Sequence, residues 1–211
     1  MGKDYELRFF NIDYKKIRAK LKKLGAKLVQ KKSLLQWDSF DTPNKKDFAR
    51  VRNEGNGTIK MTVKTDEKSV YVKSYNILVN NFEEASKLLS ALGCKKRYRV
   101  EKLREVWKIK GCKNIYIDAF PGLPWYLEIG CDSEKKLFSL AKKLGLEIKQ
   151  NAHENLGANS MYQNEYGILK SKKSSGDLTF NTVQKLFSKL IKKNKTLFLK
   201  RLREQKKIIK K

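Results

Sequence analysis

Four acidic residues stand where β-strands would bring their carboxylates together. Asp4 and Glu6 are two residues apart in an alternating polar and apolar segment, so both project from one face of the expected strand. Asp118 ends a later segment of this kind, and Glu128 lies on the next one. Carboxylate oxygens are ligands that Mg²⁺ and Mn²⁺ prefer. The four residues therefore predict a site for a divalent cation.

Basic residues occupy the polar positions of several other alternating segments. They are Arg50, Arg52, Lys60, Lys64, Lys73, Lys102 and Arg104, while Arg8 follows Asp4 and Glu6 on their own segment. Cations on one face of a strand repel each other unless an anion neutralises them. Any one pair could be ordinary surface charge, but four such strands and a separate set of carboxylates favour a bound polyanion. A metal ion with several cations suits phosphoryl or nucleotidyl transfer. The sequence has no Gly-x-x-x-x-Gly-Lys loop, which argues against P-loop chemistry.

The elements that must position these residues are strands punctuated by three helices. Residues 13–25, 81–93 and 132–145 have apolar residues at helical spacing and end in a Leu-Gly step. Period-2 alternation predicts strands at 5–9, 50–52, 59–64, 70–73, 100–104, 115–118 and 125–130. We expect about eight strands, mostly antiparallel. They could pack as a sandwich with solvated polar faces, or close into a barrel whose lumen is polar.

Six motifs, in order along the chain, resemble those of the CYTH proteins, the triphosphate tunnel metalloenzymes. The Asp4-x-Glu6-x-Arg8 start is similar to the family's Glu-x-Glu-x-Lys signature. The others are Ala49-Arg50-Val51-Arg52, Met61-Thr62-Val63-Lys64, Val100-Glu101-Lys102-Leu103-Arg104, the run from Ile117 to Gly130, and Ser160-Met161-Tyr162. The resemblance covers roughly residues 3–165. It implies an α+β fold: an eight-stranded antiparallel β-barrel, open as a tunnel, with helices packed outside it.

The resemblance also implies a role for each matching residue. Mg²⁺ or Mn²⁺ would be held by Asp4, Glu6, Asp118 and Glu128. The triphosphate would be bound by Arg8, Arg50, Arg52, Lys64, Lys73, Lys102 and Arg104, of which Lys64 and Lys102 are the candidate catalytic residues that steady the leaving group. The sequence departs from the family at Gly130, where a second glutamate is expected, and at residues 73–77, which lack its further acids. These departures predict fewer metal ligands.

The first functional hypothesis is a metal-dependent phosphohydrolase acting on a triphosphate. The family includes class IV adenylate cyclases, thiamine triphosphatases and inorganic triphosphatases. The substrate would be inorganic triphosphate, a nucleoside triphosphate or an RNA 5′-triphosphate. One alternative is a class IV-like adenylate cyclase that makes cyclic AMP and pyrophosphate from ATP. The other is a non-catalytic binder of polyphosphate or nucleic acid.

The C-terminal part of the chain is a second, strongly basic region. The chain has 211 residues and a formal net charge of +27. Residues 170–211 contain 15 Lys and Arg but only 2 acids. We therefore divide the chain into a tunnel domain at 1–169 and, at 170–211, a basic linker with an amphipathic helical tail. The tail could be docked on the barrel with a frayed end, or could be an arm that binds RNA or an anionic surface such as a membrane.

Composition also bears on the compartment. The sequence has no run long enough to span a membrane and no apolar leader, so we expect an intracellular, cytoplasmic protein. Cys94, Cys112 and Cys131 are odd in number and widely spaced, which favours reduced thiols over bridges or a zinc site. The single histidine, His153, gives no support to a zinc site either.

Overall fold

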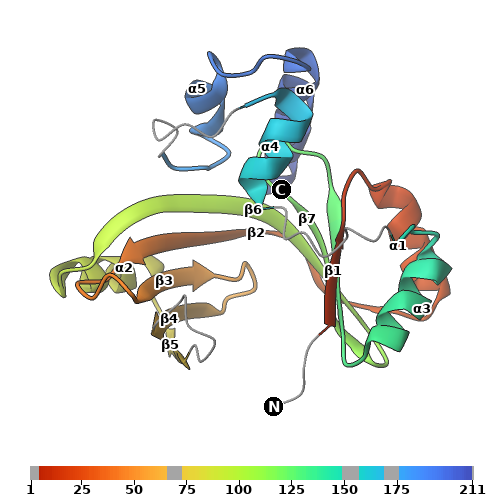
Figure 1. The fold of residues 1–211 in the computed structure, drawn as a ribbon, viewed down its shortest axis with the longest axis horizontal. Helices are drawn as coiled ribbons and strands as arrows, with labels where there is room; N and C mark the ends of the chain where they lie inside the picture. Colours follow the sequence, from red (N-terminus) through yellow and green to blue (C-terminus); the bar gives the residue numbers. More distant parts are fainter. Residues whose placement is uncertain (1–4, 66–72, 149–156, 169–175, 211) are drawn as a thin grey trace. The chain divides into compact units, whose positions relative to one another are not determined.

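A computed structural model describes residues 5–65, 73–148, 157–168 and 176–210 (Figure 1). The chain divides into two compact units. Unit 1 comprises Met1–Ser33, Leu103–Ile168 and Ile191–Lys211, and unit 2 comprises Leu34–Lys102 and Leu169–Leu190. Each unit includes part of the C-terminal region, and the division into domains at residue 169 stays a prediction.

Eight strands form one sheet in the order β1-β8-β7-β6-β2-β3-β4-β5. They are β1 (Tyr5–Phe9), β2 (Lys27–Asp41), β3 (Phe48–Asn53), β4 (Ile59–Thr65), β5 (Lys73–Val79), β6 (Lys95–Ile109), β7 (Cys112–Ala119) and β8 (Tyr126–Cys131). The predicted α+β class with eight antiparallel strands is confirmed. Among the described residues, no hydrogen-bonded ladder joins β1 to β5, so backbone pairing does not close the sheet.

The six helices described are α1 (Tyr14–Lys23), α2 (Phe82–Ala91), α3 (Glu134–Leu144), α4 (Ala158–Tyr166), α5 (Val183–Phe187) and α6 (Lys195–Ile209). The first three lie within the predicted helical segments. Asp13, Asn81 and Ser133 cap them, each accepting a hydrogen bond from the backbone N–H three residues on.

In unit 1, α1 and α3 lie on one face of the sheet (Figure 1). Alternate residues of β7 and β8, including Ile117 and Leu127, point into this core, and Trp107 from β6 is buried with them. The helices contribute residues such as Leu21 and Leu140. Because successive strand residues point to opposite faces, the polar residues between these core positions must lie on the face away from α1 and α3.

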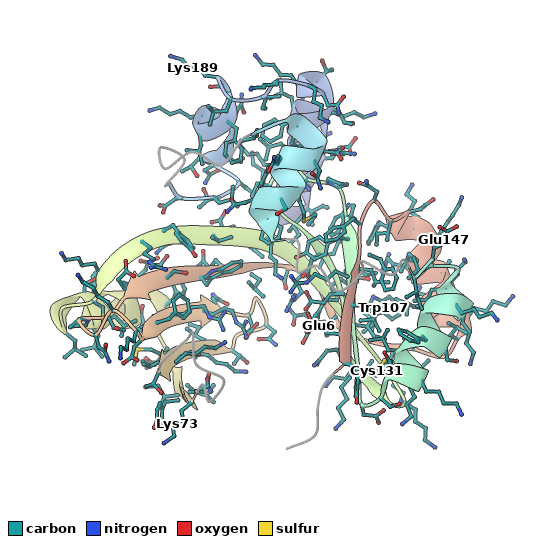
Figure 2. All side chains as sticks on the ribbon, viewed as in Figure 1. Glu6, Lys73, Trp107, Cys131, Glu147 and Lys189 are labelled. Atoms are coloured by element: carbon teal, nitrogen blue, oxygen red, sulfur yellow. A yellow bond between two sulfur atoms is a disulfide. The ribbon has the colours of Figure 1, made fainter. Side chains whose placement is uncertain are left out.

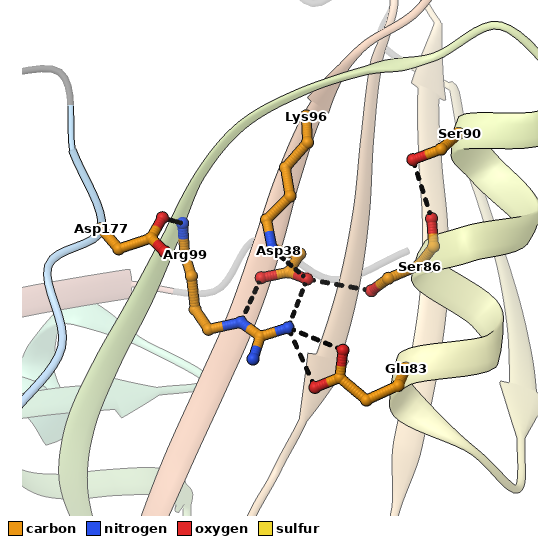
Figure 3. A network of polar contacts seen from close by, with 7 residues as sticks. All are labelled: Asp38, Glu83, Ser86, Ser90, Lys96, Arg99 and Asp177. Atoms are coloured by element: carbon orange, nitrogen blue, oxygen red, sulfur yellow. Dashed lines mark hydrogen bonds and ion pairs between the residues drawn. The ribbon is translucent and has the colours of Figure 1, made fainter.

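In unit 2, α2 packs on β2 and β3 through apolar residues such as Phe82 and Val51. Beside this core lies a fully buried carboxylate, Asp38, which accepts hydrogen bonds from Arg99, Lys96 and Ser86 (Figure 3). Burial alone would raise the pKa of Asp38, but the bonds from Arg99 and Lys96 hold it below its usual value. The network links β2 and β6 to α2.

The C-terminal region is docked rather than free. In unit 1, Phe198 of α6 is fully buried and meets Tyr166 of α4 edge to face, with ring centroids 5.2 Å apart. In unit 2, Leu178 pairs with Val100 of β6, and Phe180 is buried. The docking expected for the tail is therefore observed, and α6 continues as a regular helix to Ile209 instead of a frayed end. Binding of RNA or an anionic surface by the tail stays a prediction.

The prediction of three reduced cysteines is wrong for two of them. Cys112 and Cys131 form a disulfide, whereas Cys94 is free. Cys112 begins β7 and Cys131 ends the neighbouring antiparallel strand β8, so the pairing of the strands brings together two residues that are 19 positions apart. Among the described residues, no helix combines the length and the hydropathy needed to cross a membrane.

Candidate active site

In unit 1, the polar face of four neighbouring strands gathers three of the four predicted acids and two of the four predicted arginines. The register pairs Arg8 of β1 with Glu128 of β8, and Arg104 of β6 with Asp118 of β7. Figure 2 shows Glu6 on the opposite side of β1 from the core residue Trp107. We call Glu6, Arg8, Arg104, Asp118 and Glu128 the acid–arginine cluster.

Arg104 and Asp118 form a bidentate ion pair at the buried end of this cluster. The Arg104 Nε and Nη2 atoms donate to the two Asp118 carboxylate oxygens over 2.9 and 2.7 Å. Burial opposes the charge on Arg104, but Asp118 outweighs this effect and raises the pKa of Arg104 above its usual value. Tyr126 donates its hydroxyl to Asp118 over 3.2 Å, and the Arg104 guanidinium lies 3.7 Å from the centre of the Tyr116 ring.

Glu6, Arg8 and Glu128 form the more accessible end of the cluster. Arg8 Nε donates to Glu128 over 2.7 Å, and Arg8 Nη2 donates to Glu6 over 3.3 Å. Burial, followed by repulsion from the Glu128 carboxylate, raises the pKa of Glu6. Two carboxylates therefore share a site in which one arginine does not fully offset their mutual repulsion.

The acid–arginine cluster fits a divalent cation in part. Glu6 and Glu128 offer carboxylate oxygens, and a bound cation would relieve the repulsion that, after burial, raises the pKa of Glu6. Both oxygens of Asp118 accept from Arg104 and one also accepts from Tyr126, so Asp118 has little lone-pair capacity left for a metal. Asp4 lies outside the described residues. Within the described part of the chain, no group of three or more His, Cys, Asp or Glu residues is arranged to hold a metal ion.

Gly130 lies opposite Glu6 in the register of β1 and β8. A Cβ atom added to Gly130 would stand 3.0 Å from the Cβ atom of Asn114 on β7. The glutamate that the family has here would thus require Asn114 to move, which gives the departure at Gly130 a local packing reason.

In unit 2, the face of β3 and β4 away from α2 is basic. Arg50 lies opposite Thr62, and Arg52 lies opposite Lys60, while Lys64 continues the same face of β4. Burial, and then the charge of Arg52, lower the pKa of Arg50 to about 10. The buried Nε atoms of Arg50 and Arg52 have no hydrogen-bond partner among the described residues. We call Arg50, Arg52, Lys60 and Lys64 the basic face.

Two of the predicted phosphate ligands lie apart from the basic face. Lys73 pairs with Thr65, whereas Lys64 pairs with Ser74, so Lys73 projects from the other face of β4 and β5. It is also exposed, and its role as a phosphate ligand stays a prediction. Lys102 is only 8 % exposed and lies on β6, two residues before Arg104.

The sequence-based reasoning missed two aromatic members of the site in unit 1. Tyr116 stands two residues before Asp118, and Tyr126 stands two residues before Glu128. The same alternation that selected the two acids therefore places both tyrosines on their face. Both lie within the strands expected at 115–118 and 125–130, so their spacing from the two acids was the signal that could have identified them.

The comparisons with known proteins agree with this fold. A family model described as the CYTH domain matches residues 2–158. The PH1012 protein of Pyrococcus horikoshii OT3 is similar at 23 % identity and a TM-score of 0.54, over 69 % of this chain and 92 % of that one. A proposed adenylate cyclase from Vibrio parahaemolyticus is similar at 16 % identity and a TM-score of 0.56, over 70 % of this chain and 91 % of that one. At these identities the likeness shows the fold. A search of curated proteins found no match.

Proposed function

Because the chain belongs to the CYTH domain family, we propose that it is a metal-dependent phosphohydrolase acting on a triphosphate. The observation that carries the proposal is the state of Arg50 beside Arg52. The lowered pKa of Arg50 describes a buried cation held beside a second one, Arg52, at a cost to folding. Arg52 pairs with Glu54 through Nη2, but the buried Nε atoms of both arginines have no hydrogen-bond partner among the described residues. Phosphate oxygens are acceptors that would neutralise Arg50 and accept from the free Nε–H groups of both arginines.

The acid–arginine cluster is the proposed metal side. Glu6 and Glu128 would hold Mg²⁺ or Mn²⁺, joined by Asp4 and, through a remaining lone pair, by Asp118. A cation bound there would neutralise charge on phosphate oxygens and polarise the phosphorus. Arg8 orients Glu128 through the 2.7 Å bond, and Arg104 stands 4.0 Å from the same carboxylate. The two arginines thus fix the carboxylates before any ligand arrives, and their remaining N–H groups are proposed phosphate donors.

The basic face is the proposed phosphate side. Arg50 and Arg52 would bind phosphate oxygens, with Lys64 beside them on β4. In hydrolysis, the oxygen of a water molecule bonds to the terminal phosphorus, the bond from phosphorus to the bridging oxygen breaks, and the proton of the water leaves to solvent. Lys64 and Lys102 are the proposed groups that neutralise the charge growing on the departing diphosphate.

The proposed substrate is inorganic triphosphate, a nucleoside triphosphate or the 5′ end of a triphosphorylated RNA. One experiment separates these and the two alternatives. The purified chain is incubated with tripolyphosphate, ATP, thiamine triphosphate and triphosphorylated RNA, each with Mg²⁺ and with Mn²⁺, and every phosphorus-containing product is identified. Release of orthophosphate supports the proposal, and cyclic AMP with pyrophosphate from ATP supports the cyclase. Binding without turnover, unchanged by a chelator, supports the non-catalytic binder.

A further inference from the structure

The exposed side of α6 carries a row of cations that the proposed triphosphate chemistry does not use. Lys200, Arg203, Lys207 and Lys210 follow one another at steps of three, four and three residues, which places them along one stripe of the helix. All four are exposed, and none of them forms an ion pair with another described residue. The one exposed acid on the helix is Glu204. We call these four cations the α6 basic stripe.

The opposite side of α6 is occupied by the domain itself. Phe198, Leu202 and Gln205 are each no more than 3 % exposed. Gln205 accepts a hydrogen bond from the backbone N–H of Gly122 over 2.7 Å, and it donates to the carbonyl of Leu123 over 2.9 Å. The helix cannot turn its apolar side outward without breaking these contacts.

This docking decides between the two kinds of anionic partner considered for the tail. A helix that lies in a membrane interface inserts a free apolar face among the lipids, and its cations assist. The apolar face of α6 is already buried, so the face that a partner can reach is the basic one. A partner that is itself a row of phosphates in water fits this surface better than a bilayer does.

The length of the stripe matches such a row. From Lys200 to Lys210 the helix rises about 15 Å, at 1.5 Å per residue. A nucleic acid strand presents one phosphate per 3.4 Å of rise, so this length faces about four to five phosphates. Four cations therefore meet a comparable number of charges.

We propose that the α6 basic stripe binds the phosphate backbone of a nucleic acid strand. The surface lies outside the matched CYTH region, residues 2–158, and uses none of the proposed triphosphate ligands. Because the four side chains would contact phosphates and not base edges, we expect binding to be independent of base sequence.

The test compares two variants that lose the same charge. One carries K200Q, R203Q, K207Q and K210Q on the stripe. The matched control carries K15Q, K22Q, K135Q and K142Q, at exposed positions of α1 and α3 in the same unit. Fluorescence anisotropy measures binding to a labelled 20-nucleotide RNA strand and to duplex DNA of the same length, at four salt concentrations and without metal or triphosphate. Thermal melting verifies that both variants are folded.

The proposal predicts that the stripe variant binds RNA at least tenfold more weakly than the parent at low salt. The slope of log K against log salt becomes shallower by about 3, since each lost phosphate contact contributes about 0.7 for a single strand. The control variant keeps most of the affinity and the parent slope. The RNA and DNA arms identify which nucleic acid binds more tightly.

Equal losses in the two variants would mean that overall charge alone attracts nucleic acid, and this result would overturn the proposal. So would stripe-dependent binding to phosphatidylserine vesicles with no binding to either nucleic acid, because the partner would then be a membrane surface. Neither result depends on triphosphate turnover, so the proposed function can fail while this inference stands.

Discussion

Arg104 donates hydrogen bonds from Nε and Nη2 to the two oxygens of the Asp118 carboxylate, over 2.9 and 2.7 Å. Asp118 is fully buried. The pair joins β6 to β7 at matched positions of the register. Each partner makes the other's charge tolerable in the interior. The pair therefore belongs to the architecture of the site as well as to its chemistry.

Replacing Arg104 with Gln is expected to destabilise the protein by about 3–5 kcal/mol, because the change leaves a buried carboxylate without its counter-charge. Urea unfolding followed by circular dichroism gives the free energy. Adding Asp118→Asn to the first change should recover a large part of the loss. A single variant within about 1 kcal/mol of the parent would show that water reaches Asp118 freely.

Replacing Arg50 is expected to stabilise the protein, whereas replacing Arg104 is expected to destabilise it. The folded-state pKa of Arg50, about 10, lies below the usual value, so the folded state holds this proton less tightly than the unfolded chain does. The resulting penalty is fully present at pH 7 and disappears only as the pH rises through and above the folded pKa. Arg50→Gln should therefore stabilise the protein without ligand at pH 7, by about 1 kcal/mol.

The same variant should lose the response to phosphate. Tripolyphosphate is expected to raise the melting temperature of the parent by mass action and to raise that of Arg50→Gln much less. Lys45→Ala, which removes an exposed cation from unit 2 outside the basic face, is the control. An equal shift in all three proteins would argue against a phosphate site at Arg50.

Glu6 is expected to make the stability of the folded protein depend on pH. Its pKa is raised in the folded state, so its contribution to stability is full below the unfolded pKa and is lost as the pH rises through the folded pKa. Glu6→Gln should therefore be at least as stable as the parent at pH 7, with a difference that vanishes in acid. Melting temperatures from pH 4 to pH 8 measure this. A variant less stable at pH 7 than the parent would contradict the assignment.

Gln205 supports the turn between the two strands that carry Asp118 and Glu128. Its side chain satisfies the backbone N–H of Gly122 and the carbonyls of Leu123 and Phe120. Gln205→Ala leaves these buried groups unpaired and should cost about 2–3 kcal/mol. Glu204→Ala, at the exposed neighbouring position, is the control. Faster amide exchange at Gly122 would locate the effect at the turn, and unchanged unfolding in both variants would contradict the account.

Much of the fold followed from local patterns. The first three helices could be predicted from the sequence because each has a capping residue, an apolar stripe and a Leu-Gly step where the helix ends. Most site residues lie on strands whose alternation is regular, so the placement of Arg104 and Glu128 on polar faces was predictable. The helix α6 was also foreseeable from its spacing, though what it docks against was not.

The features that could not be predicted depend on contacts between residues far apart in the sequence. Strand β2 escaped recognition because its buried face includes Asp38, which only Arg99 and Lys96, some 60 residues away, make tolerable there. The face taken by Lys73 depends on the register between β4 and β5, which its own neighbours do not encode. The Cys112–Cys131 bond likewise depends on the pairing of β7 with β8.

The most direct test of the central claim is orthophosphate release from tripolyphosphate in the presence of Mn²⁺. We expect turnover by the parent that a chelator abolishes, and a loss of about 10²–10³-fold in kcat for Glu128→Gln. Lys45→Ala should retain the parent rate. A Glu128→Gln protein that is folded and turns over at the parent rate would contradict the account.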